Sequence, residues 1–107
     1  MLVKTNANSW TALGDPTRRT IFERLVEHPC SVGELARDLP VTRPAVSQHL
    51  KVLRDVGLVA DTRSGKQRIY RVDREGLARL REELDVFWSK TLANYKAAVE
   101  QKLEEKE

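Results

Sequence analysis

Residues 42–57 carry the signals for both ends of one helix and for its two faces. Thr42 is a suitable N-cap, Pro44 is tolerated in a first helical turn, and Gly57 provides a left-handed C-terminal stop. Inward-facing side chains recur between these ends at spacings of three and four, namely Ala45, Val46, His49, Leu50, Leu53 and Val56. The opposite face is polar and consists of Arg43, Ser47, Gln48, Lys51 and Arg54. Since Arg and Gln suit base edges and Ser and Lys suit phosphates, this face predicts contact with DNA.

A shorter helix is predicted immediately upstream. Ser31 and Glu34 have the Ser-x-x-Glu spacing of a capping box, which opens a helix that we expect to continue through Leu39. Pro40 ends this helix, because proline disfavours helical geometry in the residue before it. Two short helices joined by such a turn form a helix-turn-helix, in which the second helix enters the major groove. An ordinary helical hairpin with a solvated second face is the alternative.

Residues 58–72 are expected to form a β-hairpin. Leu58–Arg63 and Gln67–Val72 are short runs with β-branched and aromatic side chains, and Ser64, Gly65 and Lys66 join them. The side chains near the tip suit contact with a phosphate backbone better than burial, and they are Arg63, Lys66, Gln67 and Arg68. A solvated tip is the alternative, but a hairpin that follows a helix-turn-helix is typical of the wing of a winged helix.

Positive charge is concentrated in the same part of the chain. Residues 42–72 contain seven basic and two acidic residues, whereas residues 1–41 contain five of each and residues 73–107 contain seven basic and nine acidic ones. The net charge of +3 therefore comes from the segment that is predicted to face DNA.

The composition is typical of one small globular domain, 1–107. With 40% hydrophobic and 33% charged residues, the chain differs from disordered and membrane proteins. No apolar run approaches a membrane span and the first residues lack the apolar core of a signal peptide, so we expect a cytoplasmic protein without a membrane partner. The chain has one cysteine, two histidines and no Gly-rich phosphate loop, and these residues supply no combination of nucleophile, base and orienting group. The sequence therefore predicts neither an enzyme nor a cofactor.

Residues 9–41 are predicted to form a scaffold and the first helix of the helix-turn-helix. Trp10 and Leu13 can open a short amphipathic helix. Asp15 and Pro16 are a strong start for a second helix, which is expected to end near His28. Residues 1–8 have no clear periodicity.

The C-terminal third is predicted to be one long helix, 73–104, with Asp73 as its N-cap. Large apolar side chains recur along it at spacings of three and four, namely Leu77, Leu80, Leu84, Phe87, Trp88, Leu92, Tyr95, Val99 and Leu103. So long a stripe needs a partner, and the same helix of a second protomer is the simplest one. We expect its first half to pack inward. A homodimer interface is predicted around Phe87, Trp88, Leu92 and Tyr95, with help from Trp10 and Leu13.

The order of these elements resembles the ArsR/SmtB family of bacterial transcriptional repressors. The most specific runs are Ala12–Arg19, Pro44–Leu50 and Leu53–Val59, and the resemblance covers roughly residues 9–100. It implies a mainly α winged helix-turn-helix with a small β-hairpin, which dimerises through its first and last helices. It also implies that two recognition helices bind an imperfect palindrome in double-stranded DNA.

By this resemblance, Arg43, Ser47 and Gln48 fall on base-contacting positions and the wing residues fall on backbone contacts. We therefore expect a sequence-specific DNA-binding repressor. Its predicted DNA-binding residues are Thr42, Arg43, Ser47, Gln48, Lys51, Arg54, Arg63, Lys66, Gln67 and Arg68.

The chain departs from the family at the positions that bind metal in its metal sensors. Their Cys-Val-Cys-Asp-Leu pattern corresponds to Ser31–Leu35 here, so both thiolates are missing, and Cys30 is one residue out of register. The family's second metal site needs histidines on the terminal helix, where neither His28 nor His49 lies. We therefore predict no metal ligands.

Residues 85–95 resemble instead the Phe-Trp terminal helix of a metal-independent branch of the family. The inducing signal stays open, since a small ligand, a protein partner or concentration alone could control such a protein. A metal-sensing repressor with a non-standard site and a protein-interaction module are the alternatives to this interpretation.

Overall fold

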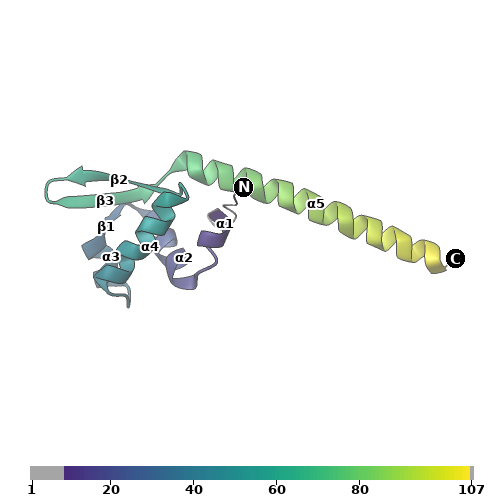
Figure 1. Cartoon of the computed structure of the whole chain (residues 1–107), viewed down its shortest axis with the longest axis horizontal. Coiled ribbons are helices and arrows are strands. Elements are labelled where there is room, and N and C mark those ends of the chain that lie inside the picture. Colours follow the sequence, from purple (N-terminus) through teal and green to yellow (C-terminus); the bar gives the residue numbers. More distant parts are fainter. Residues whose placement is uncertain (1–8, 107) are drawn as a thin grey trace, which may run out of the picture. The chain divides into compact units, whose positions relative to one another are not determined.

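A computed structural model describes residues 9–106, and Figure 1 shows the order of the elements within this range. The helices are α1 (Ser9–Ala12), α2 (Pro16–Glu27), α3 (Val32–Asp38), α4 (Arg43–Asp55) and α5 (Arg74–Lys106). The strands are β1 (Cys30–Ser31), β2 (Val59–Ser64) and β3 (Gln67–Val72). The chain divides into two compact units, of which the first ends at Leu77 and the second begins at Ala78. The prediction for residues 1–8 lies outside the described residues, and the single domain 1–107 stays a prediction.

The predicted helix starts are confirmed by their hydrogen bonds. Asp15 Oδ1 accepts from the Arg18 amide at 2.9 Å at the start of α2. The capping box of α3 is complete, because the Ser31 amide donates to Glu34 Oε1 at 2.8 Å and the Glu34 amide donates to Ser31 Oγ at 3.2 Å. Thr42 Oγ1 accepts from the Ala45 amide at 3.3 Å, so α4 begins where its sequence predicts.

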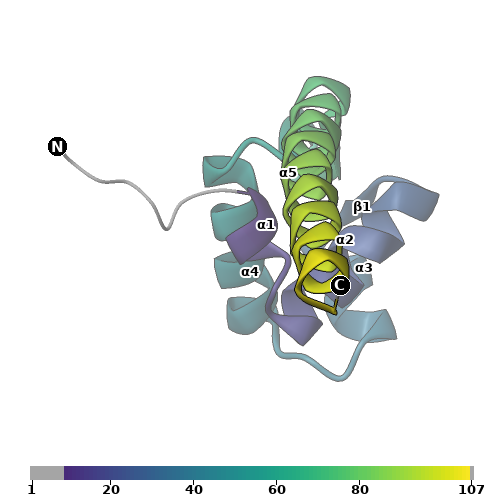
Figure 2. The ribbon, with the colours of Figure 1, turned by 90° about the vertical axis from the view of Figure 1, so that its right-hand side faces the viewer.

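The first unit is built around the inward face of α4. Val46, Leu50 and Leu53 are fully buried, and so are Ile21 of α2 and Leu35 of α3. Helices α2 and α3 both pack against α4. Helix α1 also contacts α4, and Figure 2 shows it beside that helix. The apolar stripe of α4 is therefore covered, which leaves the polar face of the helix for other contacts.

The predicted hairpin belongs to a three-stranded antiparallel sheet with the order β1-β3-β2. Strands β2 and β3 pair from Val59 opposite Val72 to Ser64 opposite Gln67, and the hairpin extends beyond the helices α1–α4 in Figure 1. Strand β1 pairs with β3 and leads directly into α3. The mainly α fold with a small hairpin is confirmed, but the sequence analysis missed β1 because two residues show no alternation.

Gly76, in the first turn of α5, lies against the backbone of the loop that follows α4. Gly57 in that loop has a φ of 83°, which glycine adopts without strain. A Cβ at Gly76 would overlap the Gly57 carbonyl oxygen. Asp73 strengthens this junction, because its amide donates to the Leu58 carbonyl at 2.9 Å and its Oδ1 accepts from the Gly76 amide at 3.2 Å. The end of α4 is thus fixed to the start of α5.

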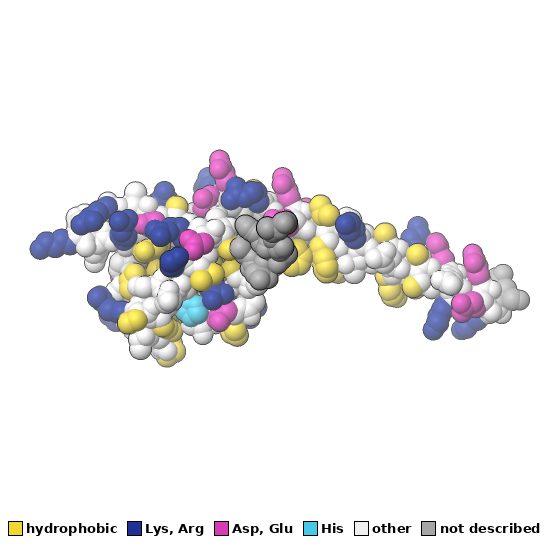
Figure 3. Space-filling model, viewed as in Figure 1, with side chains coloured by type: hydrophobic (Ala, Val, Ile, Leu, Met, Phe, Trp, Pro, Cys, Tyr) yellow, Lys and Arg dark blue, Asp and Glu magenta, His cyan; other side chains and the backbone are white. Residues whose placement is uncertain are grey.

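Helix α5 exposes most of its apolar stripe. Leu80 is buried, but Leu84 is 44% exposed, Trp88 60% and Tyr95 68%. Figure 3 shows hydrophobic side chains at intervals along this helix. The expectation that its first half packs inward stays a prediction. Among residues 9–106, no helix combines the length and the apolar character that a membrane span needs.

Candidate nucleic-acid interface

The polar face of α4 lies on the surface of the first unit. Ser47, Gln48 and Lys51 are exposed, and they alternate along the helix with the buried Val46 and Leu50. The face that the sequence assigned to DNA is therefore accessible. Thr42, also predicted to bind DNA, uses its hydroxyl to cap the helix, and this bond holds the first turn in place.

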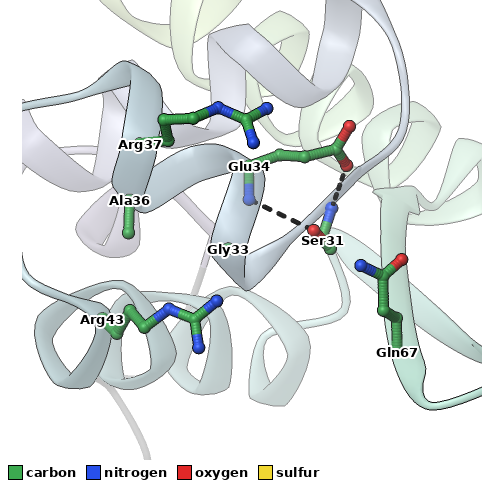
Figure 4. Close-up of a pocket in the computed structure, with 7 residues that line it drawn as sticks. All are labelled: Ser31, Gly33, Glu34, Ala36, Arg37, Arg43 and Gln67. Carbon is green, nitrogen blue, oxygen red and sulfur yellow. Dashed lines mark hydrogen bonds between the residues drawn. The ribbon is translucent and has the colours of Figure 1, made fainter.

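Helix α3, the first turn of α4 and the wing (β2, β3 and the turn that joins them) line one hollow. Its volume is about 450 Å³, and Figure 4 shows the residues around it: Ser31, Gly33, Glu34, Ala36, Arg37, Arg43 and Gln67. A second hollow of about 270 Å³ is also lined by Arg43 and Gln67, together with Lys66, Arg68 and Tyr70 of the wing. The structure thus brings together residues from both predicted DNA-contacting segments.

Gly33 leaves room for the Arg43 guanidinium at the first hollow. A Cβ at Gly33 would lie 2.5 Å from Arg43 Nη2. In Figure 4 the Arg43 side chain runs from α4 toward the side on which Gln67 lies. The sequence analysis did not find this contact, because nothing in the spacing of residues 33 and 43 predicts it.

Three of the predicted DNA-binding cations are already paired with carboxylates. Lys51 Nζ lies 3.0 Å from Asp55 Oδ2. Arg68 Nη1 lies 2.6 Å from Asp61 Oδ2, and Arg54 Nη1 lies 3.4 Å from Asp61 Oδ1. Within residues 9–106, no ion pair forms at Arg43, Arg63 or Lys66. The charges of these last three cations are not offset by a carboxylate, so they can attract an anionic partner.

Asp61 is a site residue that the sequence analysis missed. Its side chain is only 10% exposed, whereas Arg54 and Arg68 are about half exposed, at 48% and 52%. Burial by itself raises the pKa of Asp61, but the hydrogen bonds and charges of Arg68 and Arg54 outweigh this effect and hold the pKa below its usual value. The carboxylate is therefore ionised at neutral pH.

The register of the wing places two like charges side by side. Arg63 is directly opposite Arg68 in the antiparallel pair, an arrangement that is destabilising unless an anion lies nearby. Figure 3 shows basic side chains gathered on the hairpin. Asp61, which pairs with Arg68, already reduces this repulsion, and a phosphate group beside Arg63 would reduce it further, which favours binding of a nucleic-acid backbone by the wing.

The predicted dimer residues lie in both units. Trp10 and Leu13 are half-buried in the first unit. Phe87, Trp88, Leu92 and Tyr95 are exposed on α5, with between 48% and 68% of each side chain accessible. Trp10 and Leu13 thus have less surface to offer a partner than the α5 residues have. The interface itself stays a prediction.

Cys30 is buried and faces His28. Its Sγ lies 3.6 Å from His28 Nδ1, and burial raises the pKa of the thiol, with the Glu34 charge acting in the same direction. The thiol is therefore protonated at neutral pH, a state that neither binds metal nor attacks an electrophile well. In the described part of the chain, no three His, Cys, Asp or Glu side chains gather as metal ligands would.

Known proteins share both the sequence and the fold. Residues 15–61 match the family model of the bacterial regulatory proteins of the arsR family. The HTH-type transcriptional regulator Rv2034 of Mycobacterium tuberculosis is 59% identical over 87 residues, which cover 81% of this chain and 81% of that protein.

Two solved structures extend this likeness to three dimensions. An ArsR-like transcriptional regulator from Rhodococcus sp. RHA1 has a TM-score of 0.65 at 36% identity, over 81% of this chain and 85% of its own. A possible transcriptional regulator for arsenical resistance has a TM-score of 0.67 at 39% identity, over 78% of this chain and 91% of its own. The chain therefore belongs to the ArsR family of bacterial transcriptional regulators, which are DNA-binding proteins and not enzymes.

Proposed function

We propose that the protein is a repressor that binds an imperfect palindromic operator as a homodimer and does not respond to metal ions. The observation that carries this proposal is the exposed polar face of α4 beside a basic wing. Base recognition is assigned to Arg43, Ser47 and Gln48 at the start of α4. Backbone contacts are assigned to Lys51, Arg54 and the wing residues Arg63, Lys66, Gln67 and Arg68.

The homodimer is supported by the exposed stripe of α5. Trp88, Leu92 and Tyr95 lie on one side of this helix with about half or more of each side chain exposed. Large aromatic and aliphatic side chains dominate the energetics of buried interfaces, so a second copy of α5 is a suitable partner. Two-fold symmetry would place the recognition helices about 34 Å apart, one turn of B-DNA.

Selection from randomised duplex DNA tests this function directly. We expect the enriched sequences to contain two related half-sites, centred about one helical turn apart and arranged as an inverted repeat. Placed over a promoter, the selected site should reduce transcription in vitro when the protein is added. Enrichment of a single half-site would argue against the dimer, no enrichment would contradict sequence-specific binding, and increased transcription would contradict the repressor role.

Two exposed side chains should separate base recognition from backbone contact. Gln48→Ala is expected to cost about 1–3 kcal/mol of binding free energy on the selected duplex, with little effect on a scrambled duplex. Lys66→Ala should weaken both duplexes to a similar extent and reduce the salt slope by about one. Fluorescence anisotropy at several salt concentrations measures both effects. Equal losses on the two duplexes for Gln48→Ala would place the reading face elsewhere.

Zinc, cadmium and arsenite should leave the protein bound to its selected duplex. The chain has one cysteine, whose thiol is buried, whereas arsenite and zinc prefer several thiolate or imidazole ligands. Isothermal titration calorimetry should find no tight stoichiometric zinc binding. Tight binding that is lost in Cys30→Ser would overturn the metal-independent part of the proposal.

A further inference from the structure

We propose that Asp61 is a positioning residue for DNA recognition, which fixes the wing to the end of the recognition helix and raises the preference for operator over other DNA. The inference rests on the proposed function. It assigns a role to an acidic residue in the most basic part of the chain, where a carboxylate would otherwise weaken binding to any DNA.

The contacts of Asp61 join three elements. Asp61 lies on β2, its Oδ2 is 2.6 Å from Arg68 Nη1 on β3, and its Oδ1 is 3.4 Å from Arg54 Nη1 in the last turn of α4. Each carboxylate oxygen thus serves a different arginine. We call Asp61, Arg54 and Arg68 the Asp61 cluster. It is a direct polar link between the side of the protein that reads bases and the side that contacts phosphates.

Burial distinguishes this cluster from an ordinary surface ion pair. Lys51 and Asp55 on the same helix are 62% and 56% exposed, and such pairs contribute little to stability. The Asp61 side chain is 10% exposed and is shielded from water, so its attraction to the arginines is screened less. A shielded carboxylate with two partners therefore restrains the wing more than a solvated pair could.

The half-exposed arginines explain why the cluster affects selectivity. Arg54 and Arg68 are about half exposed while paired, so each can contact one phosphate beside Asp61, and removal of the carboxylate would free both for further phosphates. Free guanidinium groups strengthen binding to every duplex, because phosphate contacts carry no sequence information. A fixed wing favours only those duplexes whose groove and backbone meet α4 and the wing at the same time. Asp61 thus lowers affinity for other DNA and preserves affinity for the operator.

Asp61→Asn and Asp55→Asn form a matched pair for the test. Both remove one negative charge near the end of α4, but only the first removes the shared partner of two arginines. Each full-length variant is titrated against the selected duplex and a scrambled duplex by fluorescence anisotropy at several salt concentrations. Circular dichroism checks that each variant is folded.

We expect Asp61→Asn to bind the scrambled duplex more tightly and to lose about tenfold in the ratio of selected to scrambled affinity. Its salt slope on the scrambled duplex should become steeper by about one to two, because the released arginines displace further counterions. Asp55→Asn should change that ratio by no more than about twofold. Asp61→Glu, which keeps the charge, should restore most of the ratio. A residue that only stabilises the fold would lower the active fraction without altering the salt slope.

An unchanged ratio and salt slope in Asp61→Asn, with the wild type still selective, would overturn the inference and leave the proposed function standing. An equal change in Asp55→Asn would also overturn it, because net charge alone would then explain the effect. If Asp61→Asn does not fold, Arg54→Gln takes its place, because it removes the contact between Asp61 and α4 and leaves Arg68 bound to Asp61. An unchanged ratio of selected to scrambled affinity in Arg54→Gln would also overturn the inference. A wild type that does not discriminate between duplexes contradicts the proposed function itself.

Discussion

Leu92→Asp is expected to convert the protein into a monomer and to abolish detectable binding to the selected duplex. Leu92 is 48% exposed and lies between Trp88 and Tyr95 on the apolar stripe of α5. A carboxylate buried there without a partner would cost at least about 3 kcal/mol for each protomer of the proposed dimer. Analytical ultracentrifugation measures the dimer fraction, and anisotropy measures DNA binding.

Ala93→Asp is the matched control for this variant. It introduces the same charge one residue away, but the helical period places residue 93 on the opposite side of α5 from the stripe. We expect this control to stay dimeric and to bind the selected duplex with nearly wild-type affinity. A dimeric Leu92→Asp that binds normally would place the interface outside the α5 stripe.

Gly76→Ala is expected to destabilise the first unit by about 3 kcal/mol or more. The added methyl group would overlap the backbone carbonyl of Gly57, and a backbone atom cannot move aside as a flexible side chain can. Relief of this overlap requires α5 to separate from the loop that follows the recognition helix. Urea unfolding followed by circular dichroism measures the loss of free energy.

Glu75→Ala provides the comparison for Gly76→Ala. Its exposed side chain precedes Gly76 in the same helical turn, so its removal should change the free energy of unfolding by no more than about 0.5 kcal/mol. Similar unfolding curves for Gly76→Ala and the wild type would show that the junction adapts to a side chain. The close approach of the two backbones would then have no energetic importance.

Local signals made the helix-turn-helix predictable. The capping groups of α3 and α4 act within three residues of the sequence, and Ser31, Glu34 and Thr42 form the bonds that their spacing predicts. The two faces of α4 follow from the helical period alone, so the exposure of Gln48 and the burial of Leu50 were also predictable.

Contacts between distant residues were not predictable in the same way. The Asp61 cluster needs the hairpin register and the position of the α4 end, and neither is encoded by spacing. A partial signal existed, because strand alternation places Asp61 and Arg63 on one face, with Arg68 opposite Arg63. The partner of the α5 stripe was not predictable for another reason. An apolar stripe has the same period whether it packs against its own domain or against a partner.

The long exposed stripe of α5 has a consequence for how the proposed repressor would respond to its own abundance. From Arg81 to Lys106 every described side chain is exposed, so the lone chain leaves this surface in contact with water. If selective binding requires the dimer, operator occupancy at low protein levels rises with about the square of the chain concentration. A gradual change in synthesis would then produce a sharper change in transcription, without any small-molecule inducer.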